Sequence, residues 1–220
     1  MVNAEPRVYR GSSGAERVQR RREALVEAAF ALIAEDGWRA LRLDSLCQRA
    51  GLSKRYFYES FTDLDAVTAA VIGELGDGML ATVGAADPAL PVEEFVHVSL
   101  DALVHYVTDD PRRARVLFDE VSASSAASHY RSLLIRRTAE AIASRARLIH
   151  HITGDTDPIT ELAASLVLGG TIQALLDWID GRIAMSQQQL IDDLTALWRS
   201  VGDGAITRAQ QRATTPRTTT

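Results

Sequence analysis

The sequence predicts an all-α protein of about nine helices, on three observations. Apolar residues recur along most of the chain with the three- and four-residue spacing of amphipathic helices, as in Leu25, Ala28, Ala29, Leu32 and Ile33. No run alternates between apolar and polar residues as a half-buried strand does. The 220 residues include 14 glycines and 6 prolines, fewer turn-forming residues than a sandwich of many short strands requires.

Capping residues indicate where the helices begin. Ser53 can cap a short helix through residue 60, and Thr62 with Asp65 resembles a capping box for a helix of about 62–83. Asp110-Pro111 and Asp157-Pro158 each place an N-cap acceptor before a proline suited to the first turn. Ser186 and Gln189 form a second capping box. The first predicted helix ends near residue 37. The remaining predicted helices cover about 43–50, 92–107, 111–122, 128–152, 158–183 and 186–202.

The composition excludes several classes of protein. Apolar residues make up 46% of the chain and charged residues 24%, which excludes a disordered tether. A single cysteine, Cys47, excludes an internal disulfide framework and a cysteine-rich zinc module, and it suits a reducing compartment. No apolar run follows the N-terminal arginines before about residue 24, so we expect no signal peptide and a cytoplasmic protein.

The net charge of −5 conceals an uneven distribution. Residues 1–61 hold 11 basic and 8 acidic side chains, whereas residues 62–220 hold 13 basic and 21 acidic ones. This asymmetry indicates a basic head that could contact phosphate and an acidic body that would not. Random variation of the surface gives the same difference, and charge alone does not separate the two interpretations.

Four segments follow from these patterns. We expect a flexible arm over residues 1–16, where Gly11-Ser12-Ser13-Gly14 interrupts any apolar periodicity. A helical head covers residues 17–62, and a larger helical domain covers residues 63–202. Residues 203–220, rich in Thr, Gln and Arg, are expected to form a flexible tail.

The segment Arg42–Phe61, RLDSLCQRAGLSKRYFYESF, predicts two short helices joined by a tight turn. Gly51 stands where the chain must reverse, so the segment has the pattern of a helix-turn-helix. Lys54, Arg55 and Tyr56 lie on the outward first turn of the second helix, where such side chains can read bases in a major groove. Tyr58 lies one turn further on and suits a backbone phosphate.

This segment and its flanks resemble the DNA-binding domain of the tetracycline-repressor (TetR) family of bacterial transcriptional regulators. The resemblance covers roughly residues 20–70 and is carried by Ala28-Ala29, Glu35-Asp36-Gly37-Trp38, Leu46-Cys47, Ala50-Gly51-Leu52-Ser53, Tyr58 and Phe61. It implies a homodimeric regulator whose C-terminal domain binds a small-molecule effector and so releases a palindromic DNA operator. The alternative is a small-molecule-binding helical protein without DNA-binding activity, and a second is an adaptor that binds another protein.

Departures from the family pattern refine the expected DNA contacts. Arg42 replaces the usual Ser or Thr cap, and we expect it to contact phosphate together with Ser53, Tyr58 and Ser60. Leu64 replaces a customary lysine. Four arginines of the first helix could supply the missing phosphate contact or could lie in a solvated arm. They are Arg17, Arg20, Arg21 and Arg22.

An uncharged run from Leu162 to Leu176 predicts a buried helix. It is shorter than the ~20 residues that cross a bilayer, so we expect no membrane segment. Its small residues would allow a second helix to approach closely, which predicts a homodimer through helices of about 158–183 and 186–202. A central helix of a monomer is the alternative.

The predicted fifth helix carries a polar row, Glu93, His97, Asp101 and His105, at four-residue spacing. His97, Asp101 and His105 are weak candidates for metal ligands, with Glu120 approaching from the next helix, and a solvent-facing polar stripe is the favoured alternative.

Apolar and aromatic residues of the fifth to eighth predicted helices fit an effector pocket and equally fit an ordinary core. They are Phe95, Leu103, Tyr106, Phe118, Tyr130, Leu134, Gln173, Asp177 and Trp178. The sequence contains no GxSxG, HExxH, P-loop or GxGxxG motif. We therefore expect no enzyme activity, no catalytic residue, no metal and no cofactor.

Overall fold

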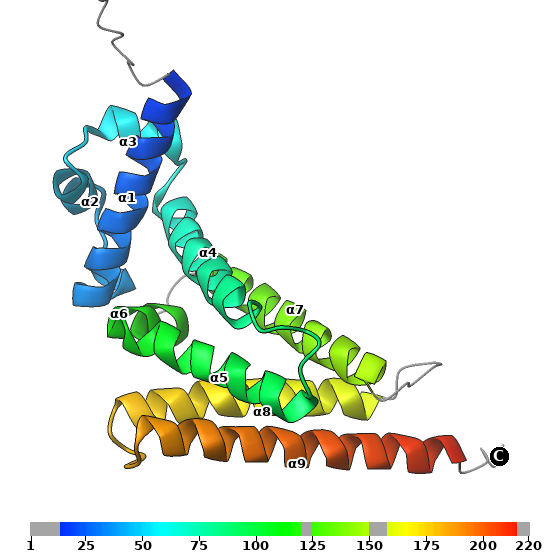
Figure 1. Cartoon of the computed structure of the whole chain (residues 1–220). Coiled ribbons are helices and arrows are strands. Elements are labelled where there is room, and N and C mark those ends of the chain that lie inside the picture. Colours follow the sequence, from blue (N-terminus) through cyan, green and yellow to red (C-terminus); the bar gives the residue numbers. More distant parts are fainter. Residues whose placement is uncertain (1–13, 120–124, 150–157, 215–220) are drawn as a thin grey trace, which may run out of the picture. The chain divides into compact units, whose positions relative to one another are not determined.

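The computed structural model describes residues 14–119, 125–149 and 158–214, and every regular element within these ranges is helical. The all-α prediction is confirmed (Figure 1). Contacts divide the chain into two units, Met1–Val71 and Ile72–Thr220.

The N-terminal unit is built on α1, Gly14–Asp36, against which two short helices pack. These are α2, Leu43–Ala50, and α3, Lys54–Ser60, preceded by a 3-10 helix η1, Trp38–Ala40. Side chains from all three α-helices form the core, including Leu25, Leu46 and Phe57. Because α1 begins at Gly14, the expected flexible arm is wrong for residues 14–16, and residues 1–13 lie outside the described ranges.

The C-terminal unit contains the remaining α-helices (Figure 1). They are α4, Leu64–Val83, whose first turns belong to the N-terminal unit, α5, Val92–Thr108, α6, Pro111–Ala114, α7, Ser125–Ile149, α8, Pro158–Ile179, and α9, Gln187–Thr214. A π-helical turn, Arg115–Asp119, follows α6 in place of the single helix predicted over 111–122. Helix α9 packs against α8 and α5, and α7 packs against α8.

Two of the predicted helix starts have the expected capping bonds. Ser186 and Gln189 cap each other reciprocally: the Ser186 N–H donates to Gln189 Oε1 at 3.0 Å, and the Gln189 N–H donates to Ser186 Oγ at 3.2 Å. The Asp110 side chain accepts from the Arg112 N–H at 3.1 Å, with Pro111 in the first turn. Both bonds satisfy a backbone donor that the helix leaves open.

Of two other capping predictions, that for α4 is wrong, and that for α3 is confirmed in the position of Ser53 but not in a side-chain bond. The N-cap of α4 is Asp63, whose Oδ1 accepts from the Ala66 N–H at 2.8 Å, one residue beyond the predicted Thr62. Asp63 stands three residues before Ala66, the spacing that a capping carboxylate requires. Ser53 precedes α3 but makes no side-chain capping bond. Helix α8 begins at Pro158 as predicted, and Asp157 lies outside the described residues.

The helix α9 continues through residues 203–214, so the prediction of a flexible tail is wrong there. Ala205, Ile206 and Ala209 are buried and extend the apolar stripe of α9 by another turn and a half. The glycines at 202 and 204 concealed this continuation in the sequence, because glycine has a low helix propensity. Residues 215–220 lie outside the described ranges.

Helices α4 and α8 have the length and mean hydropathy of a membrane span, at 20 residues and 1.3 and at 22 residues and 1.5. The core helices of soluble proteins pass the same test. In α8 only 22% of the apolar window is buried within the single chain, so much of its apolar surface is available to a partner.

Candidate functional site

The turn between α2 and α3 depends on Gly51. Its φ of +66° lies in the left-handed region, which glycine adopts without a steric penalty. The following N–H, of Leu52, donates to the Cys47 carbonyl at 2.9 Å and closes the end of α2. Below the turn, Cys47 and Phe57 are buried, so the two helices have a fixed relation to each other.

Helix α3 presents the predicted cationic and aromatic side chains outward. The Arg55 side chain is 86% exposed, that of Lys54 57% and Tyr58 62%. Tyr56 is also exposed, whereas Phe57 and Phe61 point into the core. The predicted base-reading residues Lys54, Arg55 and Tyr56 are therefore on the surface of one short helix.

Both cations of α3 have acidic partners within the unit. Lys54 Nζ lies 2.5 Å from Asp44 Oδ1 on α2, and Arg55 Nε donates to Glu59 Oε1 at 3.1 Å. The hydrogen bond to Asp44 raises the pKa of Lys54, because the carboxylate favours the charged amine. The sequence reasoning missed both partners, although the four-residue spacing of Arg55 and Glu59 is a visible signal for an ion pair.

Two predicted phosphate contacts are engaged with the backbone instead. The Arg42 Nη1 donates to the carbonyls of Arg39 at 2.7 Å and Leu41 at 2.9 Å. The Ser60 hydroxyl donates to the Tyr56 carbonyl at 3.1 Å. These bonds do not support Arg42 and Ser60 as phosphate ligands, whereas Ser53 remains exposed in front of α3.

The arginines of α1 lie on a helix rather than in a solvated arm. Arg17 and Arg20 are exposed. Arg21 and Arg22 are half-buried against two aromatic side chains, one on α3 and one just after it. The Arg21 guanidinium lies 4.5 Å from the centre of the Tyr56 ring, and that of Arg22 lies 4.5 Å from the Phe61 ring. At these distances a cation is attracted to the face of an aromatic ring.

A comparison with protein families identifies this unit. Residues 25–71 match the family described as "Bacterial regulatory proteins, tetR family". Residues 25–71 therefore carry the tetR-family domain. The resemblance noted for residues 20–70 is thereby confirmed on nearly the same residues.

One curated sequence resembles half of the chain, and several solved structures share its fold over most of its length. An "Uncharacterized HTH-type transcriptional regulator" from Haemophilus influenzae is 29% identical over 111 residues, so the match spans about half of each protein (50% and 54%). A TetR-like transcriptional regulator from Rhodococcus sp. RHA1 is 20% identical with a TM-score of 0.63, over 85% of this chain and 96% of that chain. A tetR-family regulator from Streptomyces coelicolor is 14% identical with a TM-score of 0.71, over 88% and 85%. The fatty acid degradation regulator FadR from Bacillus halodurans is 18% identical with a TM-score of 0.59, over 84% and 94%.

The C-terminal unit contains a small apolar cleft between α4, α7, α8 and the π-helical turn. Its lining is Ile72, Met79, Leu117, Phe118, Ile135, Thr138, Leu168 and Ile172. Of the nine predicted pocket residues, Phe118 lines this cleft. The side chains of Tyr130 and Leu134 are outside the described part of the structure.

The other predicted pocket residues have structural roles elsewhere. Phe95 lies under the Arg145 guanidinium, 3.5 Å from the ring centre, and the Tyr106 hydroxyl donates to the Leu75 carbonyl. Gln173 donates to Asp177, and Trp178 Nε1 donates to the carbonyl of Met185 after α8. Asp177 also pairs with Arg182, and Leu103 is partly buried on α5. Most of this set therefore does not line the cleft, because residues of a helical core and of a pocket have the same composition.

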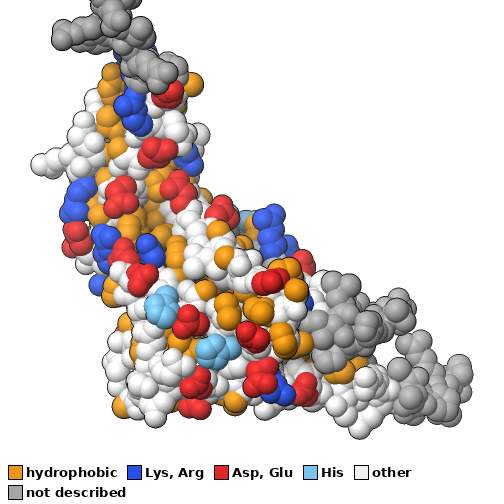
Figure 2. Space-filling model, viewed as in Figure 1, with side chains coloured by type: hydrophobic (Ala, Val, Ile, Leu, Met, Phe, Trp, Pro, Cys, Tyr) orange, Lys and Arg blue, Asp and Glu red, His pale blue; other side chains and the backbone are white. Residues whose placement is uncertain are grey.

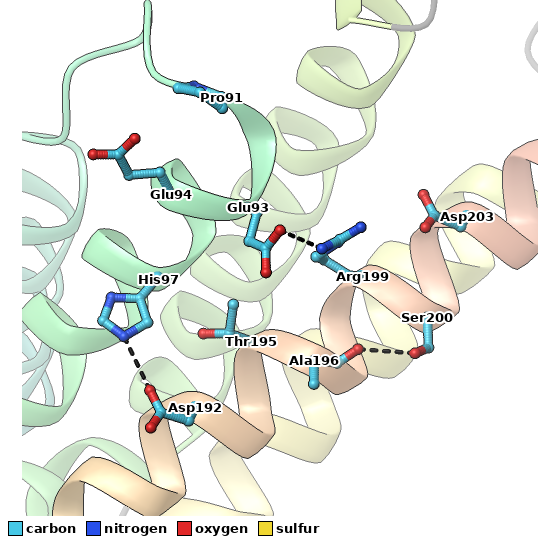
Figure 3. Close-up of a pocket in the computed structure, with 10 residues that line it drawn as sticks. All are labelled: Pro91, Glu93, Glu94, His97, Asp192, Thr195, Ala196, Arg199, Ser200 and Asp203. Carbon is cyan, nitrogen blue, oxygen red and sulfur yellow. Dashed lines mark hydrogen bonds and ion pairs between the residues drawn. The ribbon is translucent and has the colours of Figure 1, made fainter.

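The polar row of α5 is solvent-exposed, as the favoured alternative expected, and three of its four members also contact α9. His97 Nε2 lies 3.2 Å from Asp192 Oδ1, and Glu93 pairs with Arg199 (Figure 3). His105 Nε2 lies 3.2 Å from Gln187 Nε2, and its Nδ1 lies 2.9 Å from the carbonyl of Asp101. The His97–Asp192 and Glu93–Arg199 contacts line a shallow groove between the two helices.

The groove does not have the donor arrangement of a metal site. Within the described residues, no three His, Cys, Asp or Glu side chains are grouped so that they could hold an ion. On the face shown in Figure 2, histidines lie among acidic side chains over the C-terminal unit, in keeping with the negative charge expected for it. Glu120 is outside the described residues.

An apolar surface runs along α8 and α9. Leu162 and Leu166 are each 62% exposed on α8, and Leu197 is 60% exposed on α9. Gly169 and Gly170 lie on the same exposed part of α8, and a Cβ added at either would meet no atom within 4 Å. On the inner side, Trp198 Nε1 donates to Thr171 Oγ1 at 2.7 Å and ties the two helices together.

Proposed function

We propose that the protein is a sequence-specific DNA-binding transcriptional regulator that places α3 in the major groove. The main support is the first turn of α3, where Lys54, Arg55 and Tyr56 are exposed. The turn at Gly51 and the buried Phe57 fix the orientation of α3 within its unit. Lysine and arginine at this place can donate to guanine O6 and N7. Tyr58 and Ser53 flank the base-reading face and suit backbone phosphates.

The regulator acts as a homodimer through α8 and α9. Large exposed leucines on both helices, with two glycines that permit close approach, support an interface with a second copy. A two-fold axis would present two recognition helices at about 34–36 Å, the spacing of successive major grooves on a palindromic operator. Such a protein works where its DNA lies, in the cytoplasm.

A small apolar effector is the proposed signal that releases the operator. The cleft lined by Ile72, Met79, Phe118 and their neighbours offers aliphatic and aromatic walls with one hydroxyl, from Thr138. Two of its lining residues belong to α4, the helix that continues into the DNA-binding unit. A ligand that favours another packing of α4 would shift the population away from the DNA-binding arrangement. The likeness to a fatty acid degradation regulator fits an apolar signal.

The test is selection of bound duplexes from a random-sequence library, followed by sequencing and by measurement of binding at several salt concentrations. We expect a palindromic consensus and an affinity that falls steeply with salt, because cations on α3 displace counterions from phosphate. Recovery of random sequence with a flat dependence on salt would favour the alternative, a small-molecule-binding helical protein without DNA-binding activity.

A further inference from the structure

The carboxylate of Glu59 lies between two arginines that come from different helices. Its Oε1 accepts the Nε–H of Arg55 at 3.1 Å, four residues earlier on α3. Its Oε2 accepts from Nη2 of Arg21, on α1, at 3.5 Å. Each carboxylate oxygen thus has its own guanidinium.

Arg21 is held on its other side by Tyr56. Its guanidinium carbon lies 4.5 Å from the centre of the Tyr56 ring, and its Nε is buried without a hydrogen-bond partner. The Arg21 side chain is only 23% exposed, so it is packed in place rather than free in solvent. Arg21 therefore supplies Glu59 with a second, fixed positive charge in addition to that of Arg55.

The pairing with Glu59 determines which donors of Arg55 face outward. A guanidinium has one Nε–H and two terminal Nη groups in a rigid plane. Since Glu59 takes the Nε–H and the Arg55 side chain is 86% exposed, the Nη pair remains for a ligand. Two parallel donors of this kind match the O6 and N7 acceptors of guanine.

We propose that Glu59 is a positioning residue that determines base specificity by fixing Arg55 for end-on recognition of guanine, with Arg21 neutralising its charge. This inference rests on the proposed DNA-binding function. The exposed Arg55–Glu59 pair, four residues apart, contributes little to stability. Glutamine at position 59 keeps an oxygen that can accept from Arg21, so Glu59→Gln should leave the fold intact and its effect should appear in DNA recognition.

The experiment uses the duplex selected by the wild-type protein, its single base-pair variants and a scrambled duplex, with affinities measured by fluorescence anisotropy. In Glu59→Gln, binding to scrambled DNA should become tighter because a negative charge is removed near phosphate. In Glu59→Gln, discrimination at the base pair that Arg55 reads should fall roughly tenfold. It should fall further in Glu59→Ala, which has no acceptor for the Nε–H of Arg55. Glu27→Gln, at an exposed position on α1, is the control with the same change of charge.

A double variant separates positioning from direct reading. In an Arg55→Ala background, Glu59→Gln should cause no further loss of discrimination at any base pair. The proposal is overturned if Glu59→Gln alone keeps full discrimination between base pairs. It is also overturned if Glu59→Gln reduces discrimination as strongly in the Arg55→Ala background as in the wild type, because Glu59 would then read a base itself. Failure of the wild-type protein to select any duplex would overturn the proposed function as well, and so differs from failure of the inference alone.

Discussion

The hydroxyl of Tyr106 on α5 donates a hydrogen bond of 2.8 Å to the carbonyl of Leu75 on α4. The bond is possible because residue 78, one turn along α4, is glycine: a Cβ there would lie 3.0 Å from the Tyr106 oxygen. Arg113 covers the other side of the ring, with its guanidinium carbon 4.5 Å from the ring centre, and donates to the Tyr106 carbonyl. The position of α4 within the C-terminal unit is thus tied to α5 and α6.

The Tyr106 contact predicts a dependence between two substitutions. Tyr106→Phe should lower the free energy of unfolding by about 1 kcal/mol, the usual net value of one hydrogen bond. In the wild-type protein, Gly78→Ala should raise the free energy of unfolding only slightly, because the tyrosine oxygen must shift. In the Tyr106→Phe background, where only ordinary contacts at 3.6 Å remain, it should raise the free energy of unfolding by about 1 kcal/mol. Urea unfolding of the four proteins measures this, and equal effects of Gly78→Ala in both backgrounds would contradict it.

The cap of α6 predicts a pH dependence of stability. The hydrogen bond from Arg112 holds the pKa of Asp110 below its usual value of 3.8. A lowered folded-state pKa means that the contribution of Asp110 is complete above the unfolded pKa and is lost as the pH falls through the folded value. Asp110→Ala should cost about 1 kcal/mol at pH 7, and the difference from wild type should shrink below about pH 4. Thermal unfolding from pH 3 to pH 7 checks this, with Asp109→Ala as the neighbouring control.

The apolar surface of α8 predicts that a charge there separates the dimer. Leu166→Glu should give a monomer in sedimentation equilibrium, because a carboxylate would be desolvated in the interface. Val98→Glu, at an exposed apolar position on α5, makes the same chemical change away from α8 and α9 and should leave a dimer. A dimeric Leu166→Glu protein would show that another face is used.

The exposed residues of α3 predict two kinds of DNA-binding defect. Arg55→Ala should lose about 1–3 kcal/mol of discrimination at one base pair. Tyr58→Phe removes a donor suited to phosphate, so it should weaken binding to operator and scrambled duplexes by the same factor. Gel shifts on both duplexes compare the two variants, and an Arg55→Ala protein with unchanged discrimination would remove Arg55 from the reading face.

The burial of Cys47 predicts slow reactivity and a loss of stability at high pH. Burial raises the pKa of its thiol above the usual 9.0, an effect larger than the opposing influence of Lys54. Because the unfolded chain then releases its proton at lower pH than the folded one, stability should fall as the pH rises above about 9. Labelling with a thiol reagent should be slow in the native protein and fast in denaturant, and Cys47→Ala should remove this part of the pH dependence.

Local rules predicted the parts of the fold that depend on neighbouring residues. The turn at Gly51, the reciprocal cap of Ser186 and Gln189 and the Asp110-Pro111 helix start each depend on residues within five positions of one another. The outward position of Lys54, Arg55 and Tyr58 follows in the same way from the buried Phe57. Such features are encoded in the backbone preferences and periodicity of a short segment.

Features that depend on distant partners could not be obtained in this way. The polar row on α5 faces solvent as expected, but Glu93 also pairs with Arg199, 106 residues later. Spacing along one helix shows that residues share a face and does not show what lies opposite. The same limit explains the pocket, where Phe118 was identified but Ile72, Met79 and Leu168 were not.

If Lys54 reads a base as proposed, its ion pair with Asp44 is an internal competitor for that cation. On random DNA, where no base offers a better acceptor, Lys54 can stay with Asp44, so fewer counterions are displaced and residence is short. At the operator the amine must exchange a carboxylate for a base edge, and that exchange is favourable only where the acceptor is correctly placed. If α3 reads DNA as proposed, an acidic neighbour beside it would shorten the time lost at wrong sites while the protein searches a genome.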